Sequence, residues 1–157
     1  MSAVLEFREE PYDGPVASAL IDAVQQEYVD RYGGPDESPV HPGEFAPPQG
    51  RFVIGYVSTE GEPLPVAMGG LRLVEPGTAE IKRMYVVPTH RGQGHSRTVL
   101  AHLESLARSI GATRVVLETG LKQPEAMQLY ETSGYERIDG FGHYCGQELS
   151  VSYGKQL

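Results

Sequence analysis

Arg91-Gly92-Gln93-Gly94-His95-Ser96 joins an apolar run, residues 81–88, to a stretch with helical periodicity. Two glycines between a strand and a helix let the backbone turn tightly and point several N–H groups in one direction. The first turn of the helix adds unpaired N–H groups and a partial positive charge. The hexapeptide therefore predicts a site that holds a phosphate or a pyrophosphate.

The two common nucleotide-binding motifs do not match this turn. A P-loop needs a lysine directly after its last glycine, but His95 follows Gly94. A dinucleotide fingerprint needs a third glycine and stands in the first strand–helix unit, whereas this strand begins near residue 79. The pattern that remains is Arg/Gln-x-x-Gly-x-Gly/Ala, with Ser96 at its last position. A glycine-rich turn that merely caps a helix is the alternative.

This pattern resembles the pyrophosphate loop of the GNAT superfamily of N-acetyltransferases, whose members hold acetyl-CoA there. Residues 123–135 resemble the second signature of that family, Asn-x-x-Ala-x-x-Leu-Tyr-x-x-x-Gly-Phe/Tyr. The positions in register with it are Ala126, Leu129, Tyr130, Gly134 and Tyr135. Gln123 replaces the family's Asn, and Ser96 replaces the usual Gly or Ala of the loop. Two separate signatures at a workable spacing are far more specific than either one.

Composition and size limit the remaining possibilities. The chain has 157 residues, 39% of them hydrophobic, and predicts one domain over residues 1–157. Its net charge of −8 disfavours a nucleic-acid partner and is compatible with a cationic acceptor. We see no apolar run of membrane-spanning length and no signal-peptide pattern, and the single cysteine, Cys145, excludes a Cys-based zinc cluster. We therefore expect a cytoplasmic enzyme that binds neither a membrane nor a metal.

The hydrophobic pattern predicts an α/β (α+β) fold. A mixed, mostly antiparallel sheet of about six to seven strands is flanked by helices on both faces, in the element order that the family shows. The expected strands are residues 4–8, 51–59, 64–74, 78–87, 114–118, 135–138 and 149–153. The expected helices are residues 14–30, 95–110 and 124–133. The Pro- and Gly-rich segment 33–50 is either a lid or binding loop or a disordered segment.

The resemblance implies which residues bind acetyl-CoA. Main-chain N–H groups of residues 92–97 would hold the pyrophosphate, and Arg91 and Arg97 would add positive charge. The backbone of residues 84–86 would pair with the pantetheine amides, which requires this strand to separate from its neighbour. The expected cofactor-binding residues are Met84, Tyr85, Val86, Arg91, Gly92, Gln93, Gly94, His95, Ser96, Arg97 and Gln123.

Tyr130 is the predicted general acid. When an amine displaces CoA, a thiolate leaves, and a phenol with a pKa near ~10 is a neutral donor beside a thiol with a pKa near ~8.5. The tyrosine can hydrogen-bond the sulfur and then supply a proton. A tyrosine on an apolar helix face that serves only the core is the alternative.

Glu80 is the predicted general base, because an alkyl amine must lose a proton before it attacks. It resembles the catalytic glutamate of histone-acetylating family members. Strict alternation places Glu80, Lys82, Met84 and Val86 on one face of the strand and Ile81, Arg83, Tyr85 and Val87 on the other. Glu80 could instead pair with a neighbouring cation, and Glu118 or a chain of water molecules could serve as the base.

We thus expect an acetyl-CoA-dependent N-acetyltransferase that acts on a small-molecule or peptide amine, with residues 32–49, Arg83 and residues 141–145 as acceptor contacts. The acceptor itself stays open among amino acids, polyamines, drug-like amines and protein amines. A non-catalytic module that senses acetyl-CoA is the alternative, and a nucleotide-dependent transferase is a third possibility. The resemblance also makes a homodimer reasonable.

Overall fold

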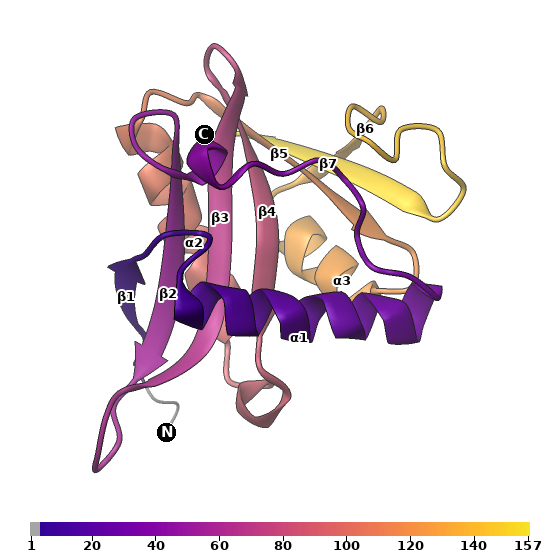
Figure 1. Ribbon diagram of the computed structural model, residues 1–157. Coiled ribbons are helices and arrows are strands. Elements are labelled where there is room, and N and C mark those ends of the chain that lie inside the picture. Colours follow the sequence, from indigo (N-terminus) through magenta and orange to yellow (C-terminus); the bar gives the residue numbers. More distant parts are fainter. Residues whose placement is uncertain (1–3) are drawn as a thin grey trace.

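The computed structural model describes residues 4–157, in which seven strands form one sheet and three α-helices cover it (Figure 1). The strands are β1 (Glu6–Glu9), β2 (Gly50–Val57), β3 (Leu64–Glu75), β4 (Thr78–Val86), β5 (Arg114–Gly120), β6 (Glu136–Ile138) and β7 (Ser150–Gln156). The helices are α1 (Pro15–Tyr32), α2 (His95–Ser109) and α3 (Pro124–Thr132), with short 3-10 turns η1 (Pro42–Phe45) and η2 (Pro88–His90). The predicted order of elements is confirmed.

The sheet has the strand order β1-β2-β3-β4-β5-β7-β6. Neighbouring strands are antiparallel except β4 and β5, which run parallel. A parallel pair needs a crossover, and η2 and α2 supply it between β4 and β5. The predicted mixed, mostly antiparallel sheet is therefore confirmed.

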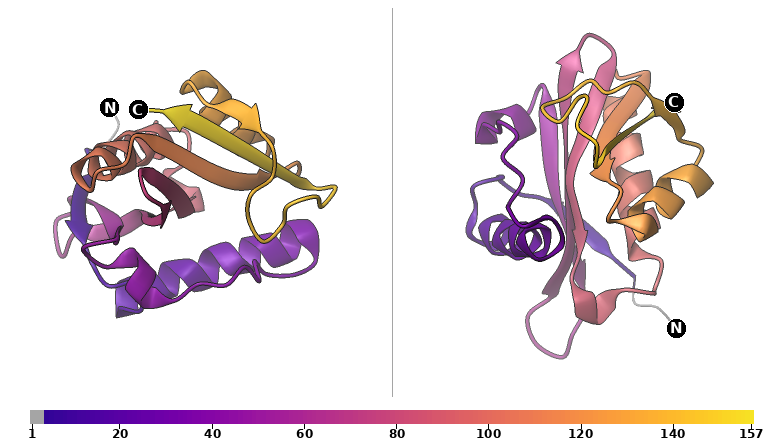
Figure 2. Two further views of the ribbon diagram at one scale, coloured as in Figure 1. Left: turned by 90° about the horizontal axis from the view of Figure 1, so that it is seen from above. Right: turned by 90° about the vertical axis from the view of Figure 1, so that its right-hand side faces the viewer.

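The helices lie on both faces of the sheet, as Figure 2 shows in its right-hand view. On one face, α1 buries Ala17, Leu20 and Val24 in a cluster that includes Phe52 and Tyr85. On the other face, α2 buries an apolar stripe in a second cluster, which Tyr130 of α3 also joins. Each helix thus presents one apolar side to the sheet. Within residues 4–157, no helix is both long enough and apolar enough to cross a bilayer.

The parallel strands β4 and β5 separate partway along their length. They pair from Thr78 opposite Arg114 to Glu80 opposite Val116, and in the described chain the pairing ends there. Figure 1 shows β5 leaving β4 at an angle beyond this point. The main-chain edge of β4 after Glu80 is therefore exposed to the gap, as the pantetheine hypothesis requires.

A bulge at Arg83 changes the predicted faces of β4. The register shifts there, so that Gly69 of β3 opposes two residues of β4, and Arg83 has a φ of 61°. Before the bulge, Ile81 faces the α2 side; after it, Met84 and Val86 do. The prediction that Met84 and Val86 share a face with Glu80 and Lys82 is wrong, because the extra residue reverses the alternation. Lys82 and Arg83 consequently both face the α1 side, where both pair with Asp36.

Candidate active site

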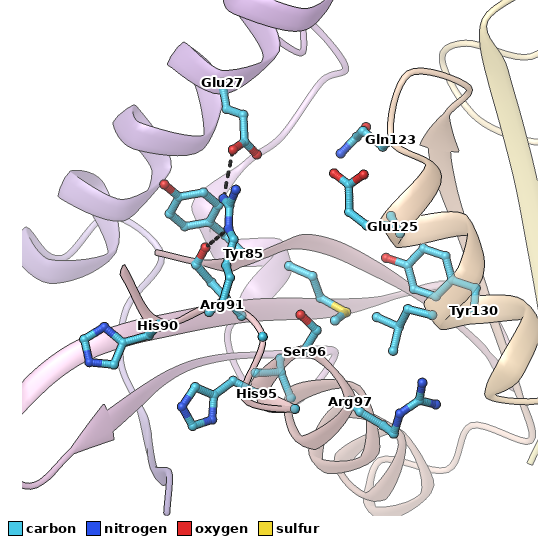
Figure 3. A pocket seen from close by; sticks show the side chains of 17 residues that line it. Glu27, Tyr85, His90, Arg91, His95, Ser96, Arg97, Gln123, Glu125 and Tyr130 are labelled. Atoms are coloured by element: carbon cyan, nitrogen blue, oxygen red, sulfur yellow. Dashed lines mark hydrogen bonds and ion pairs between the residues drawn. The ribbon is translucent and has the colours of Figure 1, made fainter. Parts of the chain in front are cut away.

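A cavity of about 400 Å³, which we call the loop cavity, lies where β4 and β5 separate (Figure 3). It is lined by most of the predicted cofactor-binding residues together with Tyr130, namely Met84, Tyr85, Val86, Arg91, Gly92, Gly94, His95, Ser96, Arg97, Gln123 and Tyr130. Gln93 and Glu80 are not among its lining residues. The structure thus brings both sequence signatures to one cavity.

The turn before α2 has the conformation that its glycines predict. Gly92 and Gly94 have φ angles of 77° and 82°, which residues other than glycine rarely adopt. Gly94 is the N-cap of α2, so the first N–H groups of the helix begin at the loop. A Cβ added at either glycine would meet no atom within 4 Å, so the space in front of the turn is open.

Both arginines of the loop are built into the cavity walls. Arg91 donates from Nη2 to Glu27 Oε1 at 2.8 Å and from Nε to the carbonyl of Val86 at 2.8 Å, and it therefore fixes the loop to α1 and β4. Arg97 donates to the hydroxyls of Ser133 at 2.9 Å and Thr132 at 3.0 Å. These contacts join α2 to the end of α3. Glu27, on the polar side of a helix, carries no sequence signal that distinguishes it from a surface residue.

Tyr130 stands across the cavity from Arg91, and Figure 3 shows its hydroxyl directed inward. The residue is 7% exposed, and its ring packs at 5.8 Å from the rings of both Tyr135 and Tyr153. Burial, assisted by the nearby Tyr28 and Tyr153, raises the pKa of the Tyr130 phenol well above its usual value. Tyr130 therefore keeps its proton at neutral pH and can act as a donor.

A second cavity of about 440 Å³, which we call the acidic cavity, adjoins the first. Gln123 lines both cavities and accepts a hydrogen bond from the Tyr32 hydroxyl at 3.2 Å. The charged residues that line the acidic cavity are Asp36, Glu37, Lys82 and Glu118. The loop cavity and the acidic cavity therefore meet at Gln123, the first residue of the second signature.

Asp36 organises one wall of the acidic cavity. Its carboxylate pairs with Arg83, lies 3.4 Å from Lys82 Nζ, and accepts hydrogen bonds from Tyr144 Oη at 2.9 Å and Ser38 Oγ at 2.7 Å. Although burial opposes ionisation of Asp36, the charges of Lys82 and Arg83 and the Ser38 hydrogen bonds hold its pKa well below the usual range. The segment after α1 is thereby fixed to the β4 bulge and to the loop after β6.

Glu118 and Glu80 have different surroundings. Glu118 lines the acidic cavity, accepts a hydrogen bond from Ser150 Oγ at 3.3 Å, and has its pKa raised by burial and by the charge of Glu80. Glu80 is 4% exposed, and its Oε1 accepts a hydrogen bond from Arg72 Nε at 3.0 Å and lies 3.0 Å from Arg72 Nη2. Arg72 also pairs with Glu44 at 3.0 Å. Glu80 is thus held in a buried ion pair behind the cavity wall.

The acceptor contacts expected from the sequence are brought together only in part. Tyr32, residues 33–37 and Tyr144 line the acidic cavity. Arg83, which is 6% exposed, does not line it, and neither do the other members of the segment 141–145. Lys82, which precedes the bulge, lines this cavity and pairs with Asp36, a contact that was not expected from the sequence.

Comparison with known proteins gives a consistent result. The family model for the acetyltransferase (GNAT) family matches residues 16–135. An IAA acetyltransferase of Azospirillum brasilense is 34% identical over 155 residues, which cover 92% of this chain and 95% of that protein. YjgM, an uncharacterized N-acetyltransferase of Escherichia coli, is 30% identical over 136 residues. This match covers 81% of this chain and 78% of YjgM.

Solved structures agree with this assignment. A protein from Klebsiella pneumoniae thought to be an acyl-CoA N-acyltransferase superposes with a TM-score of 0.81 at 31% identity, covering 99% of both chains. An acetyltransferase from Elizabethkingia anophelis with acetyl-CoA bound has the same fold, with a TM-score of 0.67 at 15% identity over 98% of each chain. The chain therefore belongs to the acetyltransferase (GNAT) family and is an acetyl-CoA-dependent acetyltransferase.

Proposed function

We propose that this enzyme transfers the acetyl group of acetyl-CoA to a primary amine by direct attack of the amine on the thioester. The observation that supports this best is the junction of two cavities at Gln123. The loop cavity carries the phosphate-type turn and Tyr130, and the acidic cavity carries Asp36, Glu37 and Glu118. A thioester held at the junction could therefore be reached by an amine that enters from the opposite side.

The loop cavity fits an extended, phosphate-bearing cosubstrate. The N–H groups of residues 92–97 would hold the pyrophosphate, with Arg91 and Arg97 adding positive charge. The free edge of β4 beyond Glu80 would pair with the pantetheine amides, as an added strand does. When bound there, acetyl-CoA supplies the activated acetyl group. The residues of this chain hold it and aim its carbonyl carbon.

Tyr130 would act as the general acid. Its raised pKa keeps it protonated, and its position in the wall near Gln123 suits a donor to the leaving sulfur. In transfer to a neutral amine, the N–C bond forms as the C–S bond breaks. Tyr130 would donate its proton to the thiolate and recover one from solvent.

Glu118 and Glu80 are the two candidate bases. Glu118 lines the acceptor side and its pKa is raised, so it is closer to the range in which a carboxylate accepts a proton effectively. Glu80, with its Oε1 bound by Arg72, can contribute by raising the pKa of Glu118 through its charge. We therefore propose Glu118 as the proton acceptor, supported by Glu80.

The pH dependence of kcat/KM tests this assignment. Because its pKa is raised, Glu118 should give an acidic limb above the usual range of a carboxylate, with activity increasing as pH rises through that limb. Glu118→Gln should remove the limb and lower kcat by about 100-fold. Glu80→Gln should shift the limb to lower pH. Loss of the limb in Glu80→Gln, with its retention in Glu118→Gln, would reassign the base to Glu80.

Turnover across a panel of amines tests the proposed function itself. Purified enzyme with acetyl-CoA should release free thiol in proportion to amine, and mass spectrometry should show acetyl on the nitrogen of the product. Binding of CoA without release of thiol from any amine would favour the alternative of a sensing module.

A further inference from the structure

We infer that the acceptor is a small aliphatic amine that carries a second positive charge, that is, a diamine or a polyamine. This inference rests on the proposed function, because it takes the acidic cavity as the acceptor site. It goes further by naming the chemical class that the cavity selects.

The cations of this wall are already paired within the protein. Lys82 is the one basic residue among those that line the acidic cavity in residues 4–157, and its Nζ lies 3.4 Å from Asp36 Oδ2. Arg83, behind the wall, is bound to the same carboxylate. Asp36 offsets one of these two positive charges, and with Glu37 and Glu118 the wall holds three carboxylates against two cations, so its net charge is negative.

The other carboxylates of the wall have no cationic partner. In the described chain, neither Glu37 nor Glu118 forms an ion pair with Lys, Arg or His. Glu118 is partly buried at the inner part of the cavity, whereas Glu37 is exposed. The main-chain N–H of Glu37 is held by Tyr144 Oη at 2.7 Å, which fixes the backbone of this residue. The cavity therefore offers an inner and an outer negative charge.

Aromatic side chains share this cavity with the two carboxylates. Tyr28, Tyr32 and Tyr144 all line the acidic cavity. A ring face attracts an ammonium group, and the attraction grows when water is excluded. Lys122, which is not one of the lining residues, already lies 5.8 Å from the centroid of the Tyr32 ring. Together, the rings and the carboxylates suit an aliphatic acceptor that carries a second ammonium group at the end away from the attacking nitrogen.

An acceptor with two amino groups would use the two carboxylates differently. Glu118 would receive the proton of the amine that attacks, while Glu37 would pair with the ammonium that stays charged. An amine with a carboxylate in place of that ammonium would bring a negative charge to a wall whose carboxylates outnumber its cations. The net charge of −8 also draws cations toward the protein.

Three amines of equal length test the inference: putrescine, the amino alcohol in which one ammonium is replaced by a hydroxyl, and γ-aminobutyrate. We expect kcat/KM to be about tenfold higher for putrescine than for the amino alcohol, and lowest for γ-aminobutyrate, since tenfold corresponds to about 1.4 kcal/mol, which is within the range of a charge pair about 4 Å apart at a protein surface. The preference for putrescine should shrink in high salt.

Two variants locate the effect. Glu37→Gln should raise KM for putrescine and lower the preference for putrescine over the amino alcohol about tenfold. Glu60→Gln removes the same charge from an exposed position in the turn between β2 and β3, so its preference should equal that of the unaltered enzyme. An equal loss of preference in both variants would overturn the role of Glu37 and reduce the effect to net charge.

The outcomes separate the inference from the proposed function. Equal rates for the three amines, a preference for γ-aminobutyrate, or turnover of other amines with none of these three would each overturn the inference and leave the proposed function intact. Failure to acetylate any amine would refute the proposed function, and the inference with it. The expected order of rates, with its loss in Glu37→Gln alone, would support both.

Discussion

The two cavities are built from different parts of the polypeptide. The loop cavity owes its main features to the backbone: two left-handed glycines, the first turn of α2 and the free edge of β4. The acidic cavity is built from side chains that come from segments far apart in the sequence. Asp36 follows α1, Lys82 precedes the bulge, Glu118 lies near the end of β5 and Tyr144 lies beyond β6.

This difference explains how one fold can retain the binding site for a cosubstrate while its specificity for the acceptor changes. A site made of N–H groups needs a fixed spacing of small residues, so it leaves a readable motif. A site made of side chains can be altered one residue at a time without disturbing the sheet. The loop cavity should therefore respond to changes in backbone conformation, and the acidic cavity to changes in charge.

Tyr130→Phe tests the junction of the two cavities and should have the largest effect. We expect kcat to fall by about 100-fold or more, because a general acid contributes roughly that factor, while CoA affinity stays nearly unchanged. Tyr135→Phe is the matched control, since that hydroxyl donates to Glu104 at 2.7 Å, outside the cavity lining. Stopped-flow or steady-state rates measure kcat, and calorimetry measures CoA binding. An unchanged rate in Tyr130→Phe would remove Tyr130 from the mechanism.

Gly94→Val tests the backbone character of the loop cavity. A side chain on this left-handed residue would enter the open space before α2 and displace the pyrophosphate from its N–H groups. Loss of two hydrogen bonds to a charged group, about 3 kcal/mol, corresponds to roughly a hundredfold increase in the Kd of CoA.

Gly111→Val is the control, because Gly111 lies just beyond the other end of α2 with a φ of 91° and nothing within 4 Å of an added Cβ. Both variants should lose similar thermal stability from backbone strain, roughly 1–3 kcal/mol. Only Gly94→Val should lose CoA affinity. Equal CoA affinities of two folded variants would contradict the loop assignment.

The same contrast shows why some features were predictable from the sequence. The order of strands and helices followed from periodicity, and the loop cavity followed from glycines and Tyr130 at family spacing. The bulge at Arg83 was not predictable, since a non-glycine residue at positive φ has no sequence signal, and it reversed the faces of Met84 and Val86. The pairing of Asp36 with Arg83 depends on that bulge, which puts Arg83 on the same side of the sheet as Lys82, so this contact could not be predicted either.

Asp36→Asn tests the side-chain character of the acidic cavity. Removing the partner of the buried Arg83 should lower the free energy of unfolding by about 3 kcal/mol and raise the KM of the amine about tenfold, with CoA affinity unchanged. The folded-state pKa of Asp36 is depressed, so its stabilisation is present above its unfolded value of about 4 and is lost as pH falls through the folded value. The variant should lack this acid-sensitive part of the stability.

Asp30→Asn is the control for this change, because Asp30 is exposed on α1 and, among residues 4–157, accepts a side-chain hydrogen bond only from Gln26, at 3.0 Å. Denaturant unfolding at neutral and acidic pH measures the stability of each variant. If Asp36→Asn raised the Kd of CoA as much as the KM of the amine, the two cavities would not be the independent regions described above.

His95→Leu should have the smallest effect. It tests whether the imidazole of His95, in addition to the main chain of the loop, binds phosphate. His95 is 4% exposed, and its Nε2 is the buried side-chain atom that lacks a hydrogen-bond partner in residues 4–157. Removing it should raise the free energy of unfolding by about 1 kcal/mol. Burial and the charge of His90 lower the pKa of His95, so stability should decline as pH falls below about 6.5, and the variant should lose this decline. A large loss of CoA affinity would instead show that the imidazole binds phosphate.

A crystal structure of the complex with CoA tests the central claim most directly, which is that the start of α2 and the gap between β4 and β5 aim the thioester at the junction of the cavities. We expect the diphosphate to lie against the N–H groups of residues 92–97 and the sulfur to lie within hydrogen-bonding distance of Tyr130 Oη, beside Gln123. A diphosphate bound elsewhere, or a sulfur out of reach of Tyr130, would contradict it.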